Sequence, residues 1–334
     1  MKGVFRMRLS ILDQLNVSTN SSSIETLHQA EEIALLADNL GYTRIWYSEH
    51  HGSDAMASAT PEILVAHIAS ITERIRVGAG GIMMMHYSPL KIAETFKTLS
   101  ALHPNRIDLG IGRAPGGNQL TTLALNPSMN NNLNLDDKLS EILMFMDDNF
   151  PEDHFYSRVS AVPREVIFPK IWLLGSGGAS AKQAGLLGIN YSFAQFISGP
   201  VNKDTLANYY DNFIPSIYQE RPETNAAYFT VVADSKEEAE YRSASYQHFV
   251  FATERGLPNK FVSPEEALSY PYTEMEKADL EKNRSRFVIG DSKSVADYFR
   301  KEEELGVSEA MIIAAGYTIE DRKTTLRLLA KEML

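Results

Sequence analysis

Short apolar runs alternate with amphipathic segments along the whole chain, and this alternation predicts strands that are each followed by a helix. The apolar runs have the length and the composition of buried parallel strands. They cover residues 8–12, 42–47, 76–83, 107–112, 171–174, 190–194, 228–233 and 309–315. Eight such units are the number that a (β/α)₈ TIM barrel requires, so we expect an α/β fold of this type. A doubly wound open sheet is the competing topology.

Capping residues mark where several of the helices begin. Ser22 and Glu25 form a capping-box pattern, and Gly41 is placed to end the helix that they start. Prolines at positions 61 and 89 follow polar residues, as in the first turn of a helix. Further helices are expected over 136–150, 180–187, 203–218 and 292–305, after Ser235, and from Thr318. The residues of the first helix expected to face inward are Ile24, Leu27, Ala34, Ala37 and Leu40.

Two stretches are longer than a minimal barrel requires. Residues 113–134 form a long polar loop after the fourth strand, and residues 250–290 separate the seventh helix from the eighth strand. Insertions of this length are typical of lids and binding loops, so 250–290 is expected to be a mobile lid. Since no shift in composition marks a boundary, residues 1–334 are expected to form one domain. Residues 1–6 are expected to be a short extension.

Composition excludes several classes of function. The chain has 334 residues and a formal net charge of −11, which disfavours nucleic acid and anionic membranes as partners. It contains no cysteine, so disulfides, thiolate metal sites and thiol catalysis are excluded. No apolar run is long enough for a membrane span or a signal peptide. We therefore expect a soluble, cytoplasmic protein.

The second predicted strand ends in three titratable residues, Glu49, His50 and His51. Active sites of TIM barrels lie at the C-terminal ends of the strands, so these residues are candidates for chemistry. Adjacent residues of a strand point to opposite faces, and at most one of the two histidines is expected to face the barrel mouth. A hydrogen-bonded structural histidine and a metal-dependent hydrolase site are the alternatives. The helical His-Glu-x-x-His pattern of zinc proteases is absent, and no metal site is expected.

Glycine-rich segments occur at three further strand ends. Gly80 and Gly81 interrupt the third strand, which indicates either close approach of a flat ligand or a bulge with tight packing. Arg113 follows Gly112 after the fourth strand and could bind a phosphate through its guanidinium group. The alternative is a surface arginine that binds no ligand. Residues 175–180 join the fifth strand to its helix and could form either an anion site or a simple turn. None of these segments has the spacing of a P-loop or of a dinucleotide fingerprint.

The order of these motifs resembles the bacterial luciferase-like family of flavin-dependent monooxygenases over nearly the whole chain. The matching segments are Trp-Tyr-Ser-Glu-His-His, Val-Gly-Ala-Gly-Gly-Ile-Met, Gly-Ile-Gly-Arg-Ala-Pro-Gly and Leu-Leu-Gly-Ser-Gly-Gly-Ala-Ser. The resemblance implies a barrel that binds FMN at its C-terminal face. It places His50 at the flavin–oxygen chemistry and a non-proline cis peptide at Gly80-Gly81. The residues that it assigns to the FMN phosphate are Arg113, Ser176, Gly177, Gly178 and Ser180.

The resemblance also implies an activity and partners. Reduced FMN and O₂ would oxygenate a small organic substrate through a C4a-peroxyflavin, with a separate flavin reductase supplying the reduced flavin. A homodimer is expected through the second and third helices. The luciferase catalytic subunit has a reactive cysteine where this chain has Gly112, so light emission is not expected. A deazaflavin (F420)-dependent oxidoreductase and a flavin-binding protein without catalysis remain alternatives.

Overall fold

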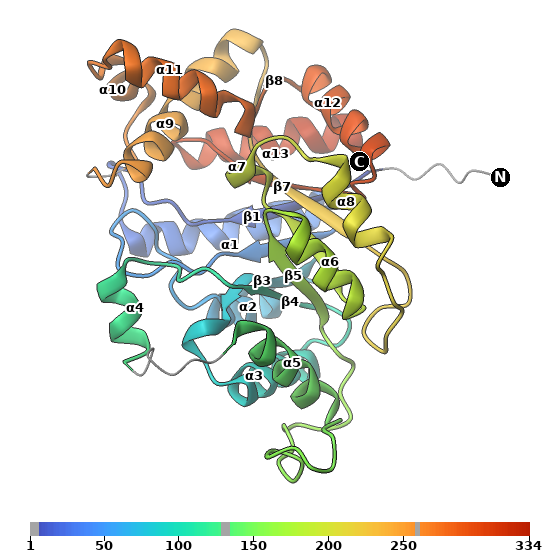
Figure 1. The fold of residues 1–334 in the computed structure, drawn as a ribbon. Coiled ribbons are helices and arrows are strands. Elements are labelled where there is room, and N and C mark those ends of the chain that lie inside the picture. Colours follow the sequence, from blue (N-terminus) through green and yellow to red (C-terminus); the bar gives the residue numbers. More distant parts are fainter. Residues whose placement is uncertain (1–6, 128–133, 258–260) are drawn as a thin grey trace, which may run out of the picture.

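The computed structural model describes residues 7–127, 134–257 and 261–334, and it forms a closed parallel β-barrel surrounded by helices (Figure 1). Around the ring the strands follow the order β1, β2, β3, β4, β5, β6, β7 and β9, and β9 pairs with β1. The predicted TIM barrel is therefore confirmed, and the competing prediction of a doubly wound open sheet is wrong. The strands are β1 Arg8–Asp13, β2 Arg44–Tyr47, β3 Arg76–Met83, β4 Ile107–Gly112, β5 Lys170–Gly175, β6 Asn190–Phe193, β7 Thr224–Ala233, β8 Phe287–Asp291 and β9 Glu309–Ala314.

A ninth strand, β8, lies outside the ring and was not predicted. It pairs in parallel with the last five residues of β7, whereas the middle of β7 pairs with β9 and its first residues pair with β6. The predicted fragment 228–233 covers only part of this ten-residue strand. Asp291 caps the helix after β8, since its carboxylate accepts a hydrogen bond from the Ser294 amide at 2.9 Å.

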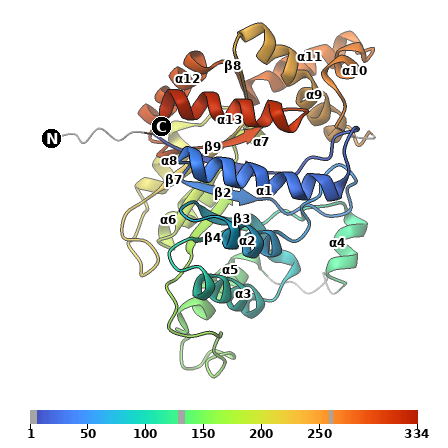
Figure 2. The same ribbon diagram turned by 180° about the vertical axis from the view of Figure 1, so that it is seen from behind.

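The helices cover the outside of the barrel on all sides in both views (Figures 1 and 2). The helices are α1 Ser23–Leu40, α2 Pro61–Ile71, α3 Pro89–Leu102, α4 Gln119–Leu125, α5 Leu135–Asp147, α6 Gly178–Leu186, α7 Gln195–Ser198, α8 Lys203–Tyr210, α9 Lys236–Glu254, α10 Pro264–Ser269, α11 Glu274–Asn283, α12 Ser292–Leu305 and α13 Ile319–Met333, with 3₁₀ turns η1 Met84–His86 and η2 Arg284–Arg286. The boundaries predicted from Ser22, Pro61, Pro89, Ser235 and Thr318 are confirmed. Helix α8 ends eight residues earlier than the predicted 203–218.

The inward face predicted for α1 is partly wrong. Ile24 is 72% exposed and Leu27 is 37% exposed, whereas Ala34 and Ala37 are buried as expected. Leu40 is partly buried against the core. The buried face instead follows residues 26, 30, 33, 34, 37 and 38. The buried positions lie on one stripe of the helix, which leaves Ile24 and Leu27 on the side toward solvent.

Both insertions contain helices. The segment 113–134 carries α4, and its residues 128–133 lie outside the described part of the chain. The segment 250–290 contains the end of α9, then α10, α11, η2 and most of β8, while 258–260 are outside the described residues. Both views place α4, α10 and α11 on the side of the barrel opposite the C-terminus of the chain (Figures 1 and 2). Whether 250–290 moves as a lid stays a prediction.

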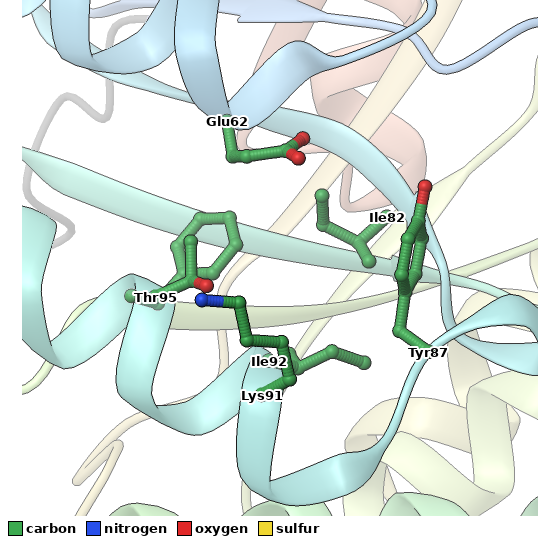
Figure 3. A pocket seen from close by; sticks show the side chains of 7 residues that line it. Glu62, Ile82, Tyr87, Lys91, Ile92 and Thr95 are labelled. Carbon is green, nitrogen blue, oxygen red and sulfur yellow. The ribbon is translucent and has the colours of Figure 1, made fainter. Parts of the chain in front are cut away.

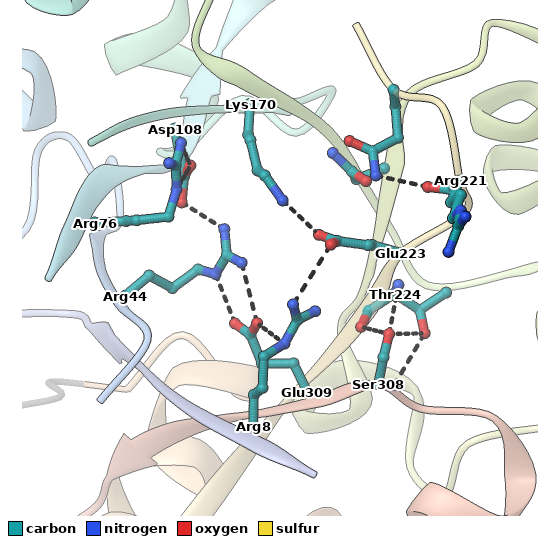
Figure 4. Close-up of polar contacts among 12 residues, drawn as sticks. Arg8, Arg44, Arg76, Asp108, Lys170, Arg221, Glu223, Thr224, Ser308 and Glu309 are labelled. Atoms are coloured by element: carbon teal, nitrogen blue, oxygen red, sulfur yellow. Dashed lines mark hydrogen bonds and ion pairs between the residues drawn. The ribbon is translucent and has the colours of Figure 1, made fainter. Parts of the chain in front are cut away.

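A buried ion cluster links strands of the barrel inside the ring (Figure 4). The Arg44 guanidinium is 1% exposed and donates to Glu309 at 2.6 Å and to Asp108 at 2.7 Å. Arg76 donates to the other oxygen of Asp108 at 2.8 Å, and the Trp46 indole donates to Asp108 at 3.0 Å. Burial alone would raise the pKa of Asp108, but Arg44 and Arg76 hold it below its ordinary value. The cluster therefore keeps its charges paired within the ring.

Candidate active site

The end of β2 borders a cavity at the barrel mouth. Trp46, Ser48, Glu49 and His50 all line this cavity, which has a volume of about 620 Å³. His51 does not line it, as expected from the alternation of side chains along an extended segment. Only one of the two histidines, His50, therefore faces the mouth.

The His50 imidazole is held in a neutral state. Ser48 Oγ lies 3.0 Å from His50 Nδ1, which orients the ring. Burial, followed by the effect of the His51 charge, lowers the pKa of His50 to about 4. Within the described residues Nε2 has no hydrogen-bond partner. Near neutral pH His50 is therefore uncharged, and its Nε2 is available for a hydrogen bond.

Glu49 and His51 form a hydrogen-bonded pair at the end of β2. Glu49 is 1% exposed, and its carboxylate accepts hydrogen bonds from the Met83 amide at 2.9 Å and from the Tyr87 hydroxyl at 2.9 Å. His51 Nε2 lies 2.8 Å from the same carboxylate. These bonds join the end of β2 to the end of β3, so Glu49 acts as a structural link between two strands that border the large cavity.

A smaller cavity of about 100 Å³ lies beside Tyr87, between α2 and α3 (Figure 3). Glu62 and Lys91 border it together with apolar side chains. Burial, with a further contribution from Glu49, raises the pKa of Glu62.

In the described parts of the chain, no three His, Asp or Glu side chains are arranged to hold a metal ion.

Gly80 and Gly81 border the large cavity, and the peptide bond between them is cis, as the resemblance predicts. A Cβ atom on Gly80 would lie 2.7 Å from the Trp46 ring, and one on Gly81 would lie 2.8 Å from the Gly110 carbonyl oxygen. The register between β3 and β4 shifts between Gly80 and Ile82. Tight packing, a register irregularity and backbone exposed to the cavity thus occur together at this position.

The residues predicted to hold a phosphate border the same cavity from β4 and β5. Arg113 Nη2 lies 2.9 Å from Asp136 Oδ1, while its Nε is buried and has no hydrogen-bond partner among the described residues. Ser176, Gly177, Gly178 and Ser180 surround the start of α6 and also line the cavity. Amides in the first turn of a helix lack intrahelical partners and attract anions. The free Arg113 Nε and these amides fit a bound phosphate group.

The Ser180 hydroxyl is already engaged within this loop. It donates to the Gly177 carbonyl oxygen at 2.9 Å and lies 3.4 Å from the Tyr191 hydroxyl. It can still accept a hydrogen bond, but it has no free proton to give to an anion in this arrangement. Ser180 therefore shapes the turn, and the neighbouring amides are better placed as donors.

Much of the cavity wall was missed by the sequence reasoning. The missed side chains are mostly apolar and belong to strands on several sides of the ring. They include Leu12, Gln14, Trp46, Met83, Phe196, Ile197, Ala227 and Met311. Alternation gives one usable signal, because Leu12 and Gln14 are in phase with each other along β1, as Trp46, Ser48 and His50 are along β2.

Comparison with known proteins identifies close relatives. The family model described as luciferase-like monooxygenase matches residues 7–309. The uncharacterized protein YceB of Bacillus subtilis is 38% identical, with 98% of this chain and 100% of that protein covered. The N-acetyl-S-alkylcysteine monooxygenase of the same organism is 36% identical, with 87% of each chain covered. The crystal structure of apo-MsnO8 has a TM-score of 0.87 at 30% identity and 98% coverage of both chains.

More distant structures share the fold with different cofactors. The oxygenating constituent of 3,6-diketocamphane monooxygenase from Pseudomonas putida, in complex with FMN, has a TM-score of 0.69 at 18% identity and 98% coverage of both chains. An F420-dependent secondary alcohol dehydrogenase has a TM-score of 0.70 at 14% identity, covering 98% of this chain and 99% of that one. At these identities the similarity shows the barrel alone.

No helix within the described ranges is long and apolar enough to cross a membrane.

Proposed function

Because the chain belongs to the luciferase-like monooxygenase family, a flavin-dependent family, we propose that it binds reduced FMN and uses O₂ to oxygenate a small organic substrate. One oxygen atom enters the substrate, and the other leaves as water with the two electrons and two protons that reduced FMN and solvent supply. The observation that supports this most is the single cavity bordered by His50, Gly80, Gly81, Arg113 and the loop at the start of α6.

The phosphate end of FMN fits the β4–β5 side of the cavity. Arg113 offers a buried N–H that has no partner in the described part of the chain, and charge-assisted hydrogen bonds contribute about 1.5–3 kcal/mol each. The amides at Gly177 and Gly178 add the favourable field of a helix N-terminus. These local groups hold the anion despite the net charge of −11 on the chain.

The other residues of the site have separate roles in the proposed reaction. Bound reduced FMN would supply the electrons for oxygen activation. His50, uncharged at neutral pH, offers Nε2 for a hydrogen bond at the reacting centre while Ser48 fixes its ring through Nδ1. The backbone of Gly80-Gly81 borders the cavity and would face a flat ring system bound against β3. Apolar walls such as Leu12 and Met311 keep water away from reactive species.

We extend the proposal to a two-component system. The segment that starts at Gly110 has glycines in its first and third places but Pro115 in the sixth, so it is no dinucleotide fingerprint. This supports delivery of reduced FMN by a separate flavin reductase. The homodimer expected from the resemblance stays a prediction.

An anaerobic titration with reduced FMN tests the proposal, followed by mixing with oxygenated buffer. The intact protein should bind reduced FMN and slow its reoxidation relative to free flavin. Arg113→Met should weaken FMN binding by about tenfold or more, because it removes charged donors. Arg158→Met is the matched control, since Arg158 is an exposed arginine outside the cavity. His50→Asn should bind FMN normally and change only the reoxidation step.

Each outcome separates the candidates. Failure to bind reduced FMN, together with binding of reduced F420, would replace FMN by the deazaflavin. Binding of FMN with a reoxidation rate equal to that of free flavin, in both the intact protein and His50→Asn, would indicate a carrier without catalysis. An equal loss of affinity in the Arg113 and Arg158 variants would contradict the proposed phosphate site.

A further inference from the structure

The wall of the large cavity opposite the phosphate loop is free for a second ligand. In the ring order, β5 and β1 lie half a turn apart, as do β4 and β9. Arg113 and the loop before α6 follow β4 and β5, whereas Gln14 and Met311 belong to the β1 and β9 side. An FMN held at β3 to β5 would therefore leave the side chains of β1 and β9 facing the substrate.

Gln14 is the polar group on this wall. A hydrogen bond from helix α9 orients its amide. Gln14 is 7% exposed and borders the cavity directly after β1. The Tyr246 hydroxyl from α9 donates to Gln14 Oε1 at 2.5 Å, and it also lies 3.1 Å from Asn16 Oδ1. Burial raises the pKa of Tyr246, so its hydroxyl keeps the proton that it donates. Gln14 Nε2 has no partner among the described residues and is left as a donor.

The charges around the cavity are also informative. Among the described lining residues, Arg113 is the one permanently cationic side chain, and His50 is neutral because its pKa is lowered to about 4. Glu49 also lines the cavity, and its carboxylate is engaged by Met83, Tyr87 and His51. The remaining wall near Gln14 consists mainly of apolar side chains from Leu12, Phe196, Ala227 and Met311. A charged substrate would lose hydration there without gaining a counter-charge.

We propose that the organic substrate is a neutral, mainly apolar molecule whose carbonyl or similar oxygen accepts a hydrogen bond from the Gln14 amide. This inference rests on the proposed function, because it assumes that Arg113 is occupied by the FMN phosphate. Tyr246 is then a positioning residue, since it presents the N–H side of Gln14 to the cavity. Small-molecule sites commonly combine such an apolar wall with a single well-placed polar group.

Calorimetric binding to the protein saturated with oxidised FMN tests the inference without turnover. The probes share one carbon skeleton and differ in one group: 2-octanone, octane, octanoate and octylamine. We expect 2-octanone to bind about tenfold more tightly than either charged probe. Gln14→Leu should reduce the preference for 2-octanone over octane by about tenfold, the size expected for one lost hydrogen bond. Gln29→Leu, on the outer helix α1, is the matched control.

Two further measurements keep the outcomes distinct. Gln14→Leu should leave the FMN dissociation constant and the unfolding midpoint unchanged, and Tyr246→Phe should weaken the ketone preference less than Gln14→Leu does. Tightest binding of octanoate or octylamine would overturn the inference, as would no saturable binding of any probe. A Gln14→Leu variant that binds FMN more weakly but keeps the probe order would assign Gln14 to the flavin instead. Failure of the intact protein to bind FMN at all would refute the proposed function first.

Discussion

Replacing Asp108 by asparagine is expected to destabilise the barrel by about 3 kcal/mol. Asp108 is fully buried and accepts hydrogen bonds from Arg44, Arg76 and the Trp46 indole. Removing one partner of a buried ion pair costs about 3–5 kcal/mol, because it leaves a charge without compensation. We place the loss at the lower end of this range, since Glu309 still pairs with Arg44 at 2.6 Å.

Urea unfolding followed by tryptophan fluorescence measures this loss. The chain has two tryptophans, and the Arg44 guanidinium lies 4.7 Å from the Trp172 ring and 6.0 Å from the Trp46 ring. Fluorescence therefore reports directly on the cluster. Asp297→Asn is the matched control, because Asp297 pairs with Arg300 on the surface with both side chains 50% exposed. Its effect should stay within about 0.5 kcal/mol.

The pH dependence of the difference gives a second check. The pKa of Asp108 is lower in the folded protein than its ordinary value, so its stabilising effect is complete above the ordinary carboxyl pKa. The effect is lost as the pH falls through the lowered pKa. The difference between the intact protein and Asp108→Asn should therefore persist at neutral pH and shrink in strong acid. A neutral-pH loss below about 1 kcal/mol, or one equal to that of Asp297→Asn, would refute the reasoning.

Three further predictions concern the site and its supporting strands. The His50 ring should titrate near pH 4 in NMR spectra and remain neutral from pH 7 down to about 5, because burial lowers its pKa to about 4; a midpoint near 6.5 would contradict this. Arg113→Lys should weaken FMN binding by about tenfold in a fluorescence titration, since lysine keeps the charge but loses the planar fork; unchanged affinity would argue against a forked contact. Gly110→Ala should destabilise the protein by about 1–3 kcal/mol in urea, because its Cβ would lie 2.4 Å from the Ala79 carbonyl oxygen, and an unchanged midpoint would contradict that packing.

Local patterns predicted the ring strands well, because each requirement is encoded in consecutive residues. Runs such as 171–174 are apolar throughout, as strands covered on both faces must be. Helix starts were equally local, since Ser235 and Glu238 are both needed in one turn and the Ser235 hydroxyl accepts from the Glu238 amide at 3.1 Å. The candidate site followed from the rule that loops after the strands meet at one end of the barrel.

Features that depend on distant partners were not predictable in this way. Strand β8 is short and is preceded by Arg284 and Arg286, so only its pairing with the end of β7 reveals it. The orientation of Gln14 depends on Tyr246, which is 232 positions away in the sequence. The exposure of Ile24 depends on which face of α1 packs against the rest of the barrel, and the face predicted from hydrophobic periodicity was partly wrong.

The extra strand β8 has a consequence for how this barrel can diversify. Because β8 pairs only with the far end of β7, the ring closes through β7 and β9 without it. The segment between β7 and β8 thus begins and ends on neighbouring strands of one sheet. Doubling the length of such a segment costs only about 0.6 kcal/mol in loop-closure entropy. A one-residue shift in the register of a ring strand, in contrast, would move all its buried side chains to the opposite face. Selection can therefore rebuild this segment freely while the catalytic scaffold keeps its register.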